Sequence, residues 1–213
     1  MLIDHSAAVF LQEDADYAQL YLLARSIGRI AFPVFAFLIA QGCVYTRNIY
    51  KYALRLGILA IISEVFFDLA LIGEINFLAQ TNIFYTLFLS VCAIAAYKQI
   101  SQPKREVVAL FLAGIPFAML AELLTVDYGG LGVMFILLLY ATNPAIKWRV
   151  AVIMAITMFF LYHQRHIIML VFSFIPIILV YFYNKKLGFH RPIIKYVFYA
   201  FYPTHLLILH MVS

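Results

Sequence analysis

The sequence predicts an all-α protein: a polytopic transmembrane bundle of about eight to nine membrane helices, forming a single domain over residues 1–213. Two observations carry this prediction. Hydrophobic residues make up 66% of the chain and charged residues only 12%, and the mean hydropathy is +0.97. Such values exclude a soluble globular protein, and the length leaves no room for a soluble domain beside the membrane helices. Because lipid offers no partner for unpaired backbone groups, every spanning segment is expected to be helical.

Apolar runs separated by short polar breaks define the expected elements, at about 20 apolar residues for each crossing. In chain order we expect helices at 1–12, 18–46, 52–73, 80–98, 106–124, 129–142, 148–163, 166–183 and 195–212. The first run is too short to cross a bilayer, so we expect it to be the outer half of a membrane helix.

Loop charges predict the orientation. Twelve of the fifteen Lys and Arg residues fall in alternate loops: Arg47, Lys51, Arg55, Lys98, Lys104, Arg105, Lys147, Arg149, Lys185, Lys186, Arg191 and Lys195. The remaining loops contain Glu13, Asp14, Asp16, Glu74 and Asp127, with Arg165 as their one cation. The positive-inside rule therefore predicts a multi-pass protein with a cytoplasmic N-terminus and an outer C-terminus.

Composition and motifs also exclude several classes of function. The net charge of +5 is the ordinary loop excess of Lys and Arg in a membrane protein, so we expect the lipid bilayer and no nucleic acid as a partner. Cys43 and Cys92 lie inside apolar runs without metal-ligand spacing, and we expect no metal. There is no HExxH or GxSG motif to indicate a metalloprotease or a rhomboid-like protease, and there is no Walker motif to indicate a P-loop nucleotide-binding protein.

The informative residues are ionisable and polar groups within the apolar runs. Each such group costs a few kcal/mol or more in a bilayer, so its presence points to a site or a pathway. With the predicted orientation, they form a layer at one depth, which opens toward the outer side or is reached from it. The layer contains Asp4, His5, Arg25, Arg29, Glu64, Asp68, Asn82, Glu122, Asp127 and His205.

Two pairs in this layer are each one helical turn apart: Arg25 with Arg29, and Glu64 with Asp68. We expect the arginines to face the carboxylates, with Arg29 against Glu64 or Asp68, as a buried ion-pair cluster that fixes helix register. The alternative is that an arginine fork holds an anionic group of a substrate.

His5 is the candidate general base, because imidazole titrates near neutrality and a carboxylate can orient it. Asp4 is its neighbour in sequence, but adjacent helical residues point about 100° apart. Glu64 or Asp68 is therefore the alternative partner of His5. His205 follows the helix-disrupting Pro203, and we expect it to line a cavity.

The chain resembles the TraX family. The resemblance is carried by Ile3-Asp4-His5, by the run from Arg25 to Leu38 with its R-x-x-G-R-x-A-F-P pattern, and by Ser63-Glu64 and Phe67-Asp68-Leu69. It continues through Asn82–Leu87, Ala121-Glu122, Asp127-Tyr128-Gly129 and Tyr202–Leu206. The family's namesake is linked to acetylation of the pilin N-terminus, and the family is similar to integral-membrane acyltransferases that use cytoplasmic acyl-CoA.

The resemblance makes Asp4, His5, Arg25, Arg29, Glu64 and Asp68 the positions to carry over, and it implies a protein of the bacterial inner membrane. Together with the polar layer, it leads us to expect His5, Asp4 and Glu64 as catalytic residues. We expect the substrate-binding residues to be Arg25, Arg29, Asp68, Asn82, Glu122, Asp127 and His205. The leading hypothesis is transfer of an acyl group, acetyl before others, from acyl-CoA to an outer amine or hydroxyl on a peptide N-terminus, a glycan or a small metabolite. The alternative is a proton-coupled transporter that uses the same carboxylates and histidines as a relay.

Overall fold

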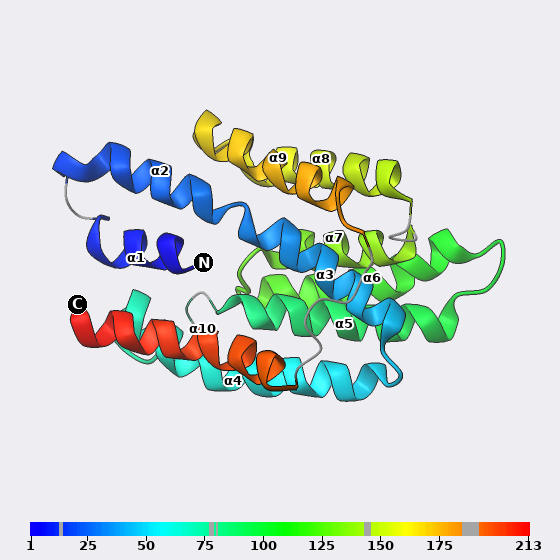
Figure 1. The fold of residues 1–213 in the computed structure, drawn as a ribbon. Helices are drawn as coiled ribbons and strands as arrows, with labels where there is room; N and C mark the ends of the chain where they lie inside the picture. Colours follow the sequence, from blue (N-terminus) through cyan, green and yellow to red (C-terminus); the bar gives the residue numbers. More distant parts are fainter. Residues whose placement is uncertain (13–14, 77–78, 80, 143–145, 185–191) are drawn as a thin grey trace.

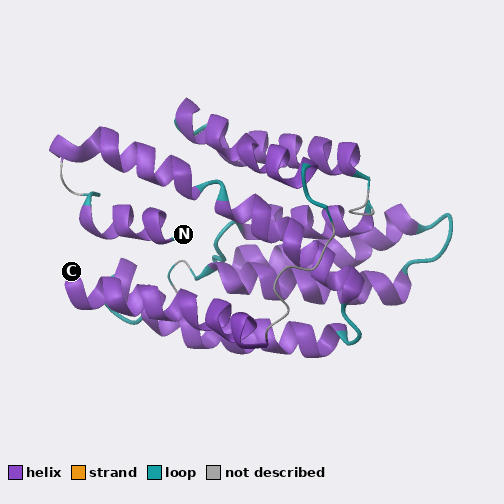
Figure 2. Cartoon of the chain, viewed as in Figure 1, coloured by secondary structure: helices purple, strands orange, loops and turns teal. Residues whose placement is uncertain are grey.

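A computed structural model describes residues 1–12, 15–76, 79, 81–142, 146–184 and 192–213. The described residues are almost entirely helical and contain no strand, which confirms the predicted all-α class (Figure 2). The helices are α1 (Leu2–Phe10), α2 (Ala18–Gly28), α3 (Ala31–Tyr45), α4 (Ile49–Leu71), α5 (Ile83–Ile100), α6 (Glu106–Leu123), α7 (Gly129–Ala141), α8 (Lys147–Tyr162), α9 (Ile167–Tyr181) and α10 (Pro192–Val212). The loop charges predicted at Glu13, Asp14, Lys185, Lys186 and Arg191 lie outside the described residues.

Several helices are long and apolar enough to cross a membrane. In the described part of the chain these are the segments Ala15–Tyr45, Ile83–Ile100 and Glu106–Leu123. Shorter apolar helices accompany them, and α4 is 23 residues long but contains charged groups. Large apolar side chains such as Leu123 and Met211 are more than three-quarters exposed on the outside of the bundle. These features are those of a multi-pass membrane protein.

The helices run along one axis, so the bundle has two ends (Figure 1). We call one the basic end, because the described loop residues Arg47, Lys51, Lys98 and Lys104 lie there. The other is the C-terminal end, where α1, α4 and α10 finish. Helix α10 packs along α4, and α1 contacts α2, α4 and α10. The first and last helices of the chain are therefore neighbours.

The expected continuous helix over 18–46 is interrupted at Arg29 and Ile30, which is a correction to the sequence reading. Pro33 explains the interruption, because it has no N–H to donate to the carbonyl of Arg29 four residues earlier. Arg29 and Ile30 keep right-handed helical backbone angles, so α2 and α3 remain one bent rod. The bend places the last turn of α2 beside α1.

The connections that lead into α5 and α7 are joined to each other. Thr81, before α5, forms a parallel bridge with Val126, before α7. The Thr81 amide donates to the Thr125 carbonyl, and the Asp127 amide donates to the Thr81 carbonyl, each at 3.2 Å. Helices α5 and α7 consequently start next to each other. Within a membrane bundle, irregular backbone of this kind is tolerated where protein buries it or where it lines a cavity.

Candidate functional site

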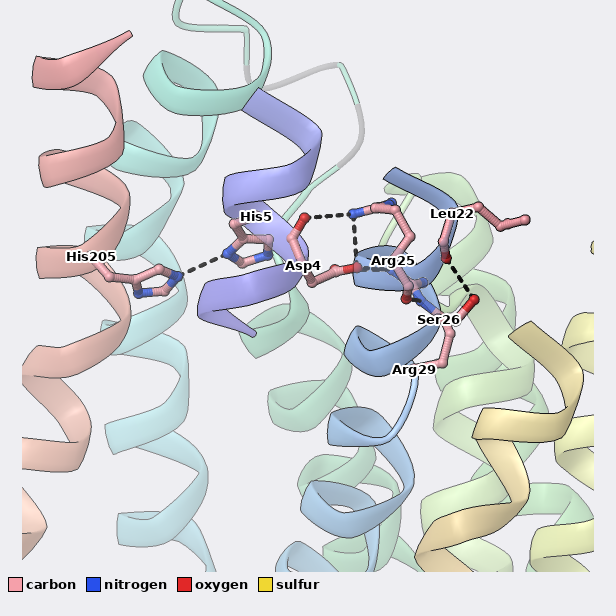
Figure 3. Close-up of polar contacts among 7 residues, drawn as sticks. All are labelled: Asp4, His5, Leu22, Arg25, Ser26, Arg29 and His205. Atoms are coloured by element: carbon pink, nitrogen blue, oxygen red, sulfur yellow. Dashed lines mark hydrogen bonds and ion pairs between the residues drawn. The ribbon is translucent and has the colours of Figure 1, made fainter. Parts of the chain in front are cut away.

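An ion cluster joins α1 to the bent rod (Figure 3). Nη2 of Arg29 donates to both carboxylate oxygens of Asp4, at 2.7 and 2.9 Å. Nη1 of Arg25 lies 3.0 Å from Oδ1 of the same carboxylate. Asp4 and Arg29 are each about nine-tenths buried. One carboxylate is therefore shared by two guanidinium groups in a region with little water.

This arrangement corrects the expected pairing of the arginines with Glu64 or Asp68. Among the described residues, neither of those carboxylates lies within ion-pair distance of an arginine. The sequence reading paired groups that share a helix face and a depth, but depth alone does not say which helices are adjacent. Helix α1 lies against α2. Asp4 therefore pairs with the arginines, where we had expected Glu64 or Asp68 of α4.

A glycine gives the Asp4 carboxylate its place. A Cβ built on Gly28 would overlap the Oδ1, Cβ and Cγ atoms of Asp4. No other residue at position 28 would let α1 approach the end of α2 so closely without moving this side chain. Gly28 and the Pro33 bend together bring Arg29 and Asp4 into contact.

His5 contacts the last helix of the chain. Its Nδ1 lies 2.8 Å from Nε2 of His205 (Figure 3). Nδ1 of His205 lies 2.8 Å from the carbonyl oxygen of Phe201. Both histidines are more than nine-tenths buried. The partner of His5 is thus His205 rather than Asp4, Glu64 or Asp68, which is a further correction.

The hydrogen bonds assign the tautomers of the two neutral rings. A carbonyl oxygen only accepts, so Nδ1 of His205 carries a proton and its Nε2 has a lone pair. Nδ1 of His5 must then donate to that lone pair, which leaves Nε2 of His5 unprotonated. The pair therefore holds His5 with a basic nitrogen on the ring side away from His205.

A small cavity of about 30 Å³ lies at this site. Its walls come from α1, the end of α2, α3, the first residue of α5, the connection before α7 and α10, and they include Asp4, His5, Ile83, Asp127 and Tyr202. Asp127 therefore joins the site, as the sequence predicted, through the connection before α7. The cavity has the size of about one water molecule, so a substrate would have to widen it.

Glu64, Asp68 and Asn82 form a separate buried cluster. Oε2 of Glu64 accepts from the backbone amide of Asn82 at 3.0 Å and from its side-chain amide. Oδ1 of Asn82 in turn accepts from the Phe84 amide and caps α5. Oδ2 of Asp68 accepts from the Asn76 amide at 2.8 Å. These contacts hold the connection between α4 and α5 and the start of α5.

Glu122 has a similar local role. Its Oε1 accepts from the Gly130 amide at 2.8 Å in the first turn of α7. A carboxylate at that position also interacts favourably with the positive end of the helix dipole. Glu122 thus positions the start of α7, and with it the adjoining Asp127, instead of lining the cavity.

Within the described ranges, no group of three or more His, Cys, Asp or Glu side chains is arranged to hold a metal ion.

Two larger hollows flank the site along the bundle axis. An apolar groove of about 480 Å³ extends toward the basic end, from Ile83 and Tyr202 to Tyr52 and Leu56. It shares Met1, Ala31, Phe35, Ile83 and Tyr202 with the small cavity. Beside it, the guanidinium of Arg55 lies over the Tyr52 ring, 5.6 Å from the centroid.

The second hollow, of about 740 Å³, lies at the C-terminal end, and we call it the vestibule. Ala8 and Val9 on α1, Ala70 on α4 and His210 on α10 line it, each within about one or two turns beyond His5, Phe67 or His205. Since α1, α4 and α10 all finish here, their last carbonyl groups make this mouth electronegative.

Two site residues were missed as individual candidates, although both occur within runs that carry the family resemblance. Tyr202 lines both the small cavity and the groove, and its ring lies edge-on to His5 with the centroids 5.7 Å apart. Tyr128 has a positive φ of 66° and stacks on Phe32, with the centroids 3.6 Å apart. A positive φ is strained for a tyrosine, and such strain is often found at functional sites. No periodicity signal marks either residue.

The all-helical bundle, with its buried cluster of two histidines, a carboxylate and two arginines, makes this a multi-pass membrane protein with a polar site inside the bundle. Comparison with known proteins makes the class specific. The profile of the TraX protein family matches residues 1–213, and the chain belongs to this family. A curated relative, "Probable fimbrial assembly protein FimC, serogroup H1" of Dichelobacter nodosus, is 30% identical over 227 aligned residues, covering 98% of this chain and 89% of the relative. No solved structure matches the chain.

Proposed function

We propose that this protein is a membrane acyltransferase that moves an acyl group, with acetyl as the first candidate, from acyl-CoA to an acceptor amine or hydroxyl at the outer side of the bacterial inner membrane. The observation that carries the proposal is the chain of hydrogen bonds from the Phe201 carbonyl through His205 to His5. It presents one unprotonated imidazole nitrogen in a buried site, which is what a general base requires.

The two hollows support separate approaches for the two substrates. With the orientation predicted from loop charges, the groove opens toward the cytoplasm and the vestibule opens outside. Acyl-CoA would extend along the groove, with its phosphates near inner cations such as Arg55 and its thioester at His5. The acceptor would come through the vestibule, where three helix ends favour a positively charged group such as an ammonium.

The relative's name indicates the acceptor to test first. The name of that protein associates it with fimbrial assembly. A fimbrial subunit would present its amino terminus at the outer side of the inner membrane. We therefore place a peptide N-terminus ahead of a glycan or a small metabolite as the acceptor.

The chemistry needs only groups already at the site. An acceptor that arrives as an ammonium first releases one proton to solvent. The neutral nitrogen then attacks the thioester carbon, and Nε2 of His5 takes a second proton from the nitrogen as the C–N bond forms. The C–S bond then breaks, and His5 returns the proton to the thiolate of CoA. Nε2 of His205 continues to accept the hydrogen bond from Nδ1 of His5, and this bond stabilises the transient imidazolium of His5. Asp4, held by Arg25 and Arg29, contributes negative charge next to that imidazolium.

One observation favours the alternative of a proton-coupled carrier. Oε1 of Glu64 and Oδ1 of Asp68 are buried without a hydrogen-bond partner in the described structure. Proton relays in membrane proteins use buried carboxylates of this kind. Substrate-dependent proton flux into proteoliposomes, without acyl transfer, would support the carrier.

The test uses the whole protein in lipid nanodiscs with radiolabelled acetyl-CoA and an acceptor peptide with a free N-terminus. We expect label on the peptide. The His5→Ala variant should bind acetyl-CoA normally and transfer about 10²–10⁴-fold more slowly. His163→Ala is the matched control, because the side-chain contacts described for His163 are with Phe159 and Phe160 of α8, and it should transfer at the parent rate.

The position of His205 gives a second comparison. His205→Ala removes the acceptor for Nδ1 of His5 and should slow transfer nearly as much as His5→Ala. In His205→Gln an amide oxygen can accept the same hydrogen bond, so part of the rate should return. Equal rates for the parent and His5→Ala would eliminate His5 as the base. If neither the parent nor the variant transfers the label, the proposed acyltransferase activity is wrong.

A further inference from the structure

Tyr202 stands where the groove meets the small cavity. It is 3% exposed, and its ring is edge-on to His5, to His205 and to Phe84, at centroid distances of 5.7, 5.3 and 4.9 Å. The side chain thus connects α10 with α1 and with the first turn of α5. A thioester that reached His5 along the groove would pass this ring.

Tyr202 lies beside the start of α5. Its ring is edge-on to Phe84 in the first turn of α5, and Tyr202 and Ile83 both line the groove and the small cavity. The phenol hydroxyl can therefore donate a hydrogen bond to an acceptor held where the groove meets the small cavity. The positive end of the α5 dipole also favours negative charge at this place.

The other polar groups around the cavity are unsuited to hold an oxyanion. Asp4 and Asp127 carry carboxyl groups, and His5 is the proposed base. Arg29 has its Nη2 on Asp4 and its Nε on the Arg25 carbonyl. Tyr128 also lines the cavity, but its ring lies flat on Phe32 and not against either histidine. Tyr202 is the remaining hydroxyl whose ring contacts His5.

We propose that Tyr202 is a catalytic residue of the acyl transfer, whose hydroxyl donates a hydrogen bond to the thioester carbonyl oxygen as that oxygen becomes an oxyanion. This inference rests on the proposed function and assigns a further residue to the same site. Attack of the acceptor nitrogen on the carbonyl carbon moves the π electrons onto oxygen, where the Tyr202 hydroxyl and the start of α5 stabilise them. The electrons return when the C–S bond breaks, and the hydroxyl keeps its proton throughout.

The Tyr202→Phe variant tests this role, because it removes one oxygen and keeps the ring contacts with His5. Loss of one oxyanion donor should lower kcat about 10²–10³-fold. KM for acetyl-CoA and binding of a CoA thioether, which lacks the carbonyl, should be unchanged. Tyr140→Phe on α7 is the matched control, since Tyr140 packs edge-on to Tyr97 and lines none of the described hollows, and it should keep the parent kcat.

A second variant covers the case in which Tyr202→Phe fails to fold. Site-specific 3-fluorotyrosine at position 202 keeps the ring and the hydroxyl and makes the hydroxyl a stronger acid. If Tyr202 holds the oxyanion, kcat and its pH profile should change while thermal stability does not. Parent-like kcat in both variants would overturn the assignment, as would a loss in Tyr202→Phe that appears only in KM. These results presuppose a parent that transfers acyl groups, so failure of the parent itself counts against the proposed function.

Discussion

Asp4→Asn is the most direct test of the ion cluster. The substitution keeps the shape of the side chain and removes the negative charge that is paired with Arg25 and Arg29. Breaking a buried pair by removing one partner costs about 3–5 kcal/mol, because the remaining charge is left without compensation. The Asp4 and Arg29 side chains are only 12% and 11% exposed, so solvent screens them little. For a chain of this size the loss corresponds to a fall in Tm of about 6–20 °C.

Glu64→Gln is the matched comparison, because the earlier expectation gave Glu64 the role that Asp4 has. Oε2 of Glu64 accepts from Asn82 and contacts no arginine among the described residues. A glutamine oxygen can accept the same bonds, so the cost should be about 1 kcal/mol. Thermal unfolding in detergent, followed by size-exclusion chromatography, measures both variants. An Asp4→Asn protein as stable as Glu64→Gln would refute the reasoning.

Three further outcomes follow from the fold. Gly28→Ala should displace the Asp4 carboxylate and lower the unfolding free energy by about 1–3 kcal/mol, with a parallel loss of acyl transfer. The same thermal assay measures the stability, and parent-like values would show that the α1–α2 contact is looser than described. Single cysteines replacing Lys104 and Glu74, in a background without Cys43 and Cys92, should react with an impermeant maleimide from opposite faces of the membrane. Labelling of both from one face would disprove the orientation. Glu122→Ala should cost about 1 kcal/mol through loss of the bond to the Gly130 amide, and hydrogen exchange should rise in the first turn of α7 but not in α6.

The sequence predicted the helices well, because apolar run length and polar breaks directly reflect the thickness of a bilayer. The start of α5 at Asn82-Ile83 and the end of α6 at Leu123 fall within a few residues of the expected bounds. The bend at Arg29 was missed because no loop-like polar break divides the run over 18–46, which was therefore predicted as one helix. The local signal for it, Pro33 four residues after Arg29, was in the sequence.

Pairing between helices was the part that the sequence could not specify. Hydropathy places Arg29, Glu64 and Asp4 at one depth, but it contains no information on which helix lies beside which. The contact of α1 with α2 and α10 separates the two clusters, with Asp4 and His5 in one and Glu64 and Asn82 in the other. Residues such as Asp4, His5 and Asp127 were predicted because buried charge is costly. Tyr202 was not, because a tyrosine in a membrane helix is common.

The two histidines are separated by 200 positions and belong to the first and the last helix of the chain. The order of synthesis therefore has a consequence for activity. His5 emerges early, but His205 enters the membrane only with α10, after the other described helices. Until then the hydrogen bond between Nδ1 of His5 and His205 is absent, so under the proposed mechanism a chain without α10 should be inert. Proteins grow from the N-terminus at about 5–20 residues each second, so this bond would form roughly ten seconds or more after His5 is made.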